Sequence, residues 1–176
     1  MKKILLFSLI SIFIVGALIL LIFFTKPKEY LSIQNDKVFF GMSTNELIKI
    51  KGDPIEINSD IGDTPFDEYV FIEKLFGYNT RGSYSFNKSF FGLKLQSAYF
   101  VVDNLNYDDA KLCIDNVLHS FESFYSKKNN FYNNGLQSND VSYIETSFGT
   151  NDGATGISCD MVYKDNSLII NIIKQD

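Results

Sequence analysis

Hydrophobic residues form one long apolar run and, after it, two groups of shorter periodic segments. Residues 4–24 are almost all apolar, which is the length that a helix needs to cross a hydrocarbon core. Two lysines precede this run and no small-residue cleavage site follows it, so the sequence predicts an uncleaved transmembrane signal anchor over residues 1–25. The N-terminus would be cytoplasmic, and residues 28–176 would be extracytoplasmic, in the periplasm or at the cell surface. A cleaved signal peptide and the reverse topology are the alternatives.

A short helix is predicted after a linker of residues 26–37. Ser43 and Glu46 have the spacing of a capping box, in which each side chain binds the backbone of the other residue. Gly52 stands where a helix ends, and a proline follows two residues later. Strand-like runs come next, and glycines, Gly82 among them, and a proline separate them. These runs are residues 55–58, 68–73, 83–87 and 93–102.

A longer helix is predicted over residues 107–127, with Asn106 as its N-cap. Its apolar residues recur at helical spacing and form one stripe, which predicts that one face of the helix is buried. Residues 126–140 are polar and predict a loop. Strand-like runs then close the chain at residues 141–148, 156–163 and 167–173, with a hairpin turn at residues 164–166.

The order of these elements predicts an α+β fold, with helices packed on one face of a small antiparallel sheet and one transmembrane helix before them. Residues 38–102 would form a first helix-plus-strands unit, and residues 103–176 would form a second. The shared order of elements permits tandem repeats, although the helix lengths differ, and we expect the two units to pack together as one globular domain.

Composition and charge exclude several classes of protein. The 176-residue chain has a net charge of -5, and beyond residue 24 the 14 basic and 21 acidic side chains give -7. An acidic surplus argues against nucleic acid as a partner. One histidine and two cysteines are too few for a zinc ribbon, an iron-sulfur cluster or a disulfide framework. No serine-hydrolase, phosphate-loop or zinc-protease motif occurs, so we expect no enzyme activity, no metal and no cofactor.

The segment around the first helix resembles the signature of the SmpA/OmlA/BamE-like envelope domain. The matching residues are Gly41, Met42, Ser43, Leu47, Gly52 and Pro54, and Glu46 completes the capping box. Lys51 stands where that signature usually has leucine, which predicts a less buried helix end. The resemblance implies a helical pair against a small antiparallel sheet, as in the tandem repeats of beta-lactamase inhibitory protein.

The resemblance also implies extracytoplasmic binding of proteins without catalysis, although this chain lacks the lipobox of the family's outer-membrane lipoproteins. We therefore predict a membrane-anchored, non-catalytic protein-binding module of the bacterial cell envelope. Its partners would be another envelope or membrane protein and, through residues 4–24, the lipid bilayer. The alternative is an immunity or inhibitor protein whose acidic surface neutralises a basic toxin or enzyme.

Aromatic residues supply the candidate binding surface. The chain has 17 Phe, 10 Tyr and no Trp, and alternate positions of a strand cannot all face one core. Some of these rings would therefore be exposed and bind a partner, while the alternative is a core filled by large residues. The candidate residues are Tyr84, Phe86, Phe90, Phe91 and Tyr99.

Cys113 and Cys159 lie in the apolar stripes of the second helix and of a strand. An oxidising compartment would permit a disulfide between them, and the alternative is a pair of buried thiols.

Two acidic patterns have simpler explanations than metal binding. Asp115, His119 and Glu122 share one helix face, but this face is opposite the apolar stripe, so we interpret it as solvated. The acidic run of Asp60, Asp63, Asp67 and Glu68 lacks the spacing of a calcium loop, so we interpret it as a solvated loop.

Overall fold

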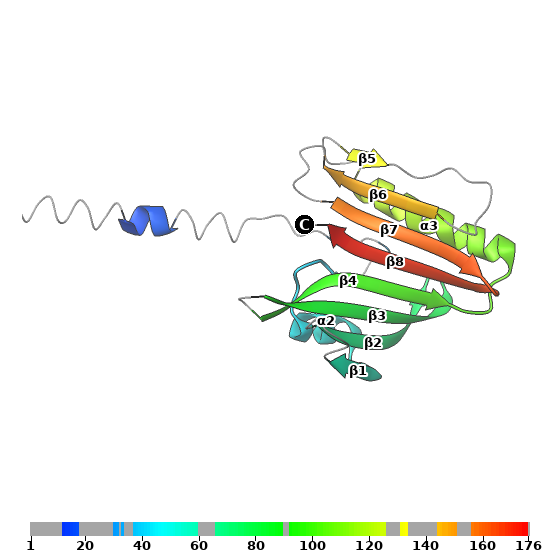
Figure 1. The fold of residues 1–176 in the computed structure, drawn as a ribbon, viewed down its shortest axis with the longest axis horizontal. Helices are drawn as coiled ribbons and strands as arrows, with labels where there is room; N and C mark the ends of the chain where they lie inside the picture. Colours follow the sequence, from blue (N-terminus) through cyan, green and yellow to red (C-terminus); the bar gives the residue numbers. More distant parts are fainter. Residues whose placement is uncertain are drawn as a thin grey trace, which may run out of the picture.

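The computed structural model describes residues 12–17, 30–31, 33, 37–59, 66–89, 92–125, 131–133, 144–150 and 156–175. Its main feature is one antiparallel sheet of eight strands (Figure 1). The strand order is β1-β2-β3-β4-β8-β7-β6-β5. Strands that follow one another in the chain are thus neighbours in the sheet, except at the centre, where β4 pairs with β8.

Each half of the sheet follows one helix. The first half consists of α2 (Thr44–Lys51), β1 (Glu56–Ser59), β2 (Phe66–Leu75), β3 (Tyr78–Ser89) and β4 (Gly92–Val102). The second half consists of α3 (Tyr107–Tyr125), β5 (Phe131–Asn133), β6 (Ile144–Thr150), β7 (Gly156–Lys164) and β8 (Ser167–Gln175). In the described residues both halves have the same element order, a helix and then four strands, and they join through their last strands.

The prediction of a membrane anchor is contradicted. Within residues 4–24 the structure describes residues 12–17, which are helical. None of the helices in the described ranges is long and apolar enough to cross a membrane. The predicted transmembrane helix, signal anchor and single-pass localisation are therefore wrong. The rest of that segment, and much of the 26–37 linker, lie outside the described residues.

The predicted fold class is also wrong. We expected helices on a small sheet behind a transmembrane helix, but the described residues form mainly one large antiparallel sheet with few helices. The strands are longer than the sequence pattern indicated, because β3 continues through Gly82, which we had expected to separate two strands. A further short strand, β5, occurs within the segment predicted to be a loop.

One hydrophobic core includes buried residues of both helices and alternate residues of the strands. The buried residues of α3 are Ala110, Cys113, Ile114, Val117 and Phe121, and those of β7 and β8 are Ile157, Cys159, Met161, Leu168, Ile170 and Ile172. Leu47 of α2 joins the same core. The sheet therefore has a core face, toward these residues, and an open face, which carries the intervening residues of each strand.

Local signals predicted from the sequence are confirmed. In the capping box, the Ser43 amide donates to Glu46 Oε2 at 2.7 Å, and the Glu46 amide donates to Ser43 Oγ at 3.4 Å. The Asp109 amide donates to Asn106 Oδ1 at 2.8 Å, so Asn106 caps α3. The hairpin between β7 and β8 turns through Asp165 and Asn166, both with positive φ, as a tight two-residue turn requires.

Candidate binding surface

The structure separates the aromatic residues that were predicted to form a binding surface. Tyr84 and Phe86 lie on the core face and are fully buried, so for these two the prediction is wrong. Tyr99 lies on the open face and is 39% exposed. Phe90 and Phe91 lie outside the described residues. Tyr99 is thus the one predicted binding residue that the described part of the chain places at the surface.

Tyr99 sits near the centre of the open face. It is on β4, directly opposite Ser83 of β3 on one side and Asn171 of β8 on the other. The next row of the open face crosses five strands and is mainly apolar, with Arg81 as its charged member. Its register is Ile72 of β2, Arg81 of β3, Val101 of β4, Ile169 of β8 and Val162 of β7.

We define the open-face patch by the apolar members of this row together with the tyrosine: Ile72, Tyr99, Val101, Val162 and Ile169. Ile72 is well exposed, and the three others of the row are half-buried. On a sheet face in contact with water, the side chains are normally polar. The open-face patch is apolar instead, in the middle of the sheet.

Polar contacts border the open-face patch at the β1 end. The Arg81 guanidinium and the Glu56 carboxylate form an ion pair of 2.6 Å that reaches across β2. Val70 of β2 also lies on the open face, between the two strands that this ion pair joins, and is fully buried. Asn58 donates to Glu68 Oε2 at 3.1 Å from β1 to β2. These contacts hold β1 to the sheet, and the Arg81–Glu56 pair separates Ile72 from the rest of the patch.

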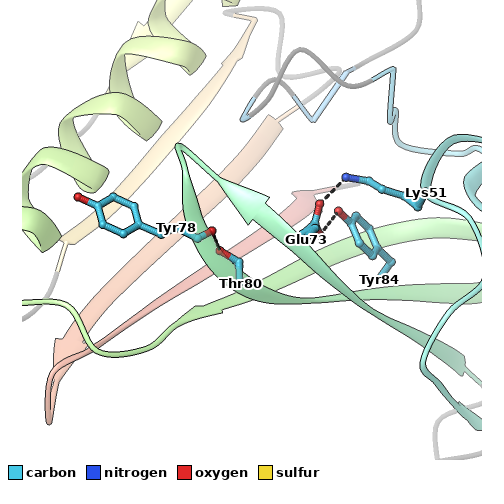
Figure 2. A network of polar contacts seen from close by, with 5 residues as sticks. All are labelled: Lys51, Glu73, Tyr78, Thr80 and Tyr84. Carbon is cyan, nitrogen blue, oxygen red and sulfur yellow. Dashed lines mark hydrogen bonds and ion pairs between the residues drawn. The ribbon is translucent and has the colours of Figure 1, made fainter.

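A polar network that sequence reasoning missed lies on the core face below the end of α2 (Figure 2). Lys51 Nζ pairs with Glu73 Oε2 at 2.5 Å, and Tyr84 donates its hydroxyl to Glu73 Oε1 at 2.8 Å. Lys51 Nζ is also 5.5 Å from the centre of the Tyr84 ring. Both charged side chains are only 9% exposed. The expectation that Lys51 marks a less buried helix end is therefore wrong, since a counter-charge on β2 allows the lysine to be buried.

Gly82 makes room for this network. It is directly opposite Phe71 on β2, and a Cβ at position 82 would lie 2.0 Å from Glu73 Oε1. Glycine inside a strand often marks such a close approach. The network joins α2 to the sheet through an ion pair and a hydrogen bond. Its role is to hold the helix against the sheet.

A second polar link connects the β2–β3 hairpin to α3. The Tyr78 hydroxyl donates to Asp109 Oδ1 at 3.1 Å, and Thr80 Oγ1 donates to the Tyr78 carbonyl at 3.0 Å, as Figure 2 shows for the latter. Partial burial and the bond to the Asp109 carboxylate raise the pKa of the Tyr78 phenol. The link ties the first half of the molecule to the helix of the second.

The two cysteines are buried free thiols, one on α3 and one on β7, so the structure has thiols where a disulfide was predicted. Burial raises the pKa of the Cys113 thiol from 9.0 to about 12 and raises that of Cys159 further. A thiol with so high a pKa stays protonated near neutral pH and is a poor nucleophile.

The other residues singled out from the sequence lie in the core, at backbone positions with positive φ, or on the exposed side of α3. Met42 and Leu47 are fully buried, while Gly41 and Gly52 have positive φ, which glycine adopts readily. The side chains of Asp115, His119 and Glu122 lie on the exposed side of α3. Within the described ranges, no three potential metal-ligating side chains gather in one place.

Comparison with protein-family models, curated proteins and solved structures finds no match to this chain. The resemblance of residues 41–54 to the SmpA/OmlA/BamE-like domain is therefore still a prediction.

Proposed function

We propose that this protein is a non-catalytic protein-binding module that uses the open-face patch. The observation that carries the proposal is Tyr99, an exposed aromatic residue near the centre of the sheet and beside an apolar row. Tyrosine supplies a large contact area at a low cost in conformational entropy and is enriched among residues that dominate binding energy.

The surroundings of Tyr99 support the same function. Val101, Ile169 and Val162 are contiguous from β4 to β7, and the Arg81–Glu56 ion pair borders them on the β3 side, between them and Ile72. An apolar centre with a polar rim is the common anatomy of protein interfaces. The resemblance of residues 41–54 to a protein-binding domain points in the same direction.

An inhibitor or immunity protein is the alternative form of this function. The net charge of -5 favours a basic partner, because opposite charges speed the encounter of two proteins. The two forms differ in what binding does to the partner: an inhibitor abolishes an activity at one-to-one stoichiometry, and an adaptor does not.

Site-specific photo-crosslinking tests the proposal. A photoreactive phenylalanine analogue at position 99 should capture a partner, whereas the same analogue at position 112, on the exposed side of α3, should not. The captured partner is then purified and its Kd is measured with the unmodified chain and with variants. Tyr99→Ala should weaken binding by a factor of about 30 or more, as expected for a central aromatic residue, and Leu112→Ala should leave the Kd unchanged.

Equal capture at both positions, or a Kd that changes less than about threefold on Tyr99→Ala, would overturn the proposal, because a central aromatic anchor contributes well over 1 kcal/mol. Far-UV circular dichroism of both variants checks that the sheet is intact. A purified partner with enzymatic activity allows the adaptor and inhibitor forms to be told apart by titration.

A further inference from the structure

The β1 edge of the sheet is a second exposed apolar region. Among the described residues β1 pairs with β2 alone, so its other side is the edge of the sheet. Ile55 and Ile57 are 59% and 53% exposed, and Ile50, near the end of α2, is also exposed. Two exposed isoleucines, Ile55 just before β1 and Ile57 within it, thus lie at this edge of the sheet.

β1 is short and carries one charged residue, Glu56, but it has no lysine and no proline within the strand. Natural edge strands carry lysine, proline, or a bulge that discourages pairing with another chain. Residues Glu56–Ser59 have the sequence Glu-Ile-Asn-Ser and pair with β2 in continuous register. Pro54 limits the edge only before the strand begins. Among the described residues, no strand pairs with the outer side of β1.

The two sides of β1 differ in chemistry. Ile57 is opposite Tyr69, whose ring packs against Phe86, so Ile57 extends the core face past its last strand. Glu56 is opposite Val70 and reaches over the open face to Arg81. A strand added beside β1 would place alternate residues next to Ile57 and next to Glu56. Apolar residues fit the first position, and at the second position a basic residue would share the Glu56 carboxylate with Arg81.

Charge decides between partners. From residue 52 to residue 73 the chain has seven acidic residues and no basic one, a run that includes the acidic loop found in the sequence. A second copy of this chain would bring its own acidic run to the same edge, and like charges close together across a strand pair are unfavourable. A basic segment would find complementary charge.

We propose that the β1 edge binds an extended segment of a partner protein in which apolar and basic residues alternate, and that this segment adds as a ninth strand. The site is three strands away from Tyr99 and does not depend on the open-face patch. Main-chain hydrogen bonds give such strand addition its affinity, and the alternating side chains give it specificity.

The test uses the full chain and an amidated peptide of nine alternating valine and lysine residues, with binding followed by fluorescence anisotropy. The peptide should bind and should slow hydrogen exchange at the amides of β1. An alternating valine and glutamate peptide should not bind. A valine and lysine peptide with N-methyl groups on alternate residues should bind at least about tenfold more weakly, because it has lost backbone donors.

Matched variants locate the site. Ile57→Lys should weaken peptide binding at least about tenfold, because lysine on an edge discourages pairing. Ile55→Lys, just before the strand, should weaken peptide binding to the same extent. Because position 55 lies outside β1, this variant guards against a loss of binding that is due to local unfolding of β1. Leu112→Lys adds the same charge on α3 at a position that is 55% exposed and should not change the Kd.

Several results would overturn this proposal: no binding, equal binding of the glutamate peptide, an equal loss with Leu112→Lys, or a dimer that Ile57→Lys dissociates, which would identify a second copy as the occupant. Tyr99→Ala should leave peptide binding unchanged. Failure of the β1 site is thereby distinguishable from failure of the open-face patch.

Discussion

Separating the charges of the Lys51–Glu73 ion pair should destabilise the fold strongly. Both side chains are 9% exposed, so removing either one leaves a buried charge without its counter-charge. Single removal of a partner from a buried pair typically costs about 3–5 kcal/mol. We therefore expect a loss of about 3 kcal/mol or more in the free energy of unfolding for Lys51→Met and for Glu73→Leu.

The double variant should recover most of that loss. Apolar residues of similar volume at both positions remove the need to desolvate two ions, and such replacements are often neutral or stabilising. Tyr84 would still lose its acceptor on Glu73, at a cost of about 1 kcal/mol. The coupling energy between the two positions should consequently be at least about 3 kcal/mol.

Urea unfolding followed by far-UV circular dichroism measures these values, since the chain has no tryptophan to report by fluorescence. With a slope of about 2 kcal/mol per M urea, each single variant should lower the midpoint by about 1.5 M or more. The control is the half-exposed Arg81–Glu56 ion pair, for which Arg81→Met and Glu56→Gln should show a coupling energy below about 1 kcal/mol. An equally small coupling for Lys51 and Glu73 would refute the reasoning.

Four other predictions test the packing of the core and the capping of α2. Gly82→Ala should cost about 1–3 kcal/mol in urea unfolding, because its Cβ would displace a carboxylate that two bonds hold, and most of this cost should disappear in a Glu73→Ala background. Ser43→Ala should cost about 1 kcal/mol by the same measurement, through loss of the N-cap of α2. Cys113 and Cys159 should resist iodoacetamide at pH 8 in the folded chain and react in urea; fast alkylation without urea would contradict their burial. Because burial raises the folded pKa of Cys113 from 9.0 to about 12, its contribution to stability is complete below pH 9 and should be lost as the pH rises from 9 toward 12, which a falling urea midpoint over that range would show.

Local signals in the sequence were enough to predict the helix starts and the last hairpin. The capping box of Ser43 and Glu46 and the N-cap Asn106 act within three residues, so neighbouring sequence determines them. The prediction of a transmembrane helix rested mainly on apolar length, and none of the helices in the described residues is long and apolar enough to cross a membrane. The prediction of a small sheet failed because the pairing of β4 with β8 joins strands that are distant in the chain.

The exposed side of β4 could not be predicted by alternation. Leu95 and Tyr99 are four residues apart and should share a face of a regular strand. Leu95 is nevertheless buried in the core, while Tyr99 lies on the open face. The register explains this, because Ser85 pairs with Ser97 but Phe86 pairs with Leu95, so β4 contains one extra residue there. Such a bulge reverses the alternation, and its position depends on the partner strand rather than on β4 alone.

The core network shows why a single position can mislead. Taken alone, Lys51 in place of an apolar residue indicates an exposed helix end. Its burial depends on Glu73, 22 residues later, and the Glu73 carboxylate in turn needs the space that Gly82 leaves. A charge at one position therefore requires a counter-charge at the second and a missing side chain at the third. Lys51→Leu alone, although it restores the residue expected from the resemblance, should destabilise this protein, and it should become tolerable only together with an apolar residue at position 73.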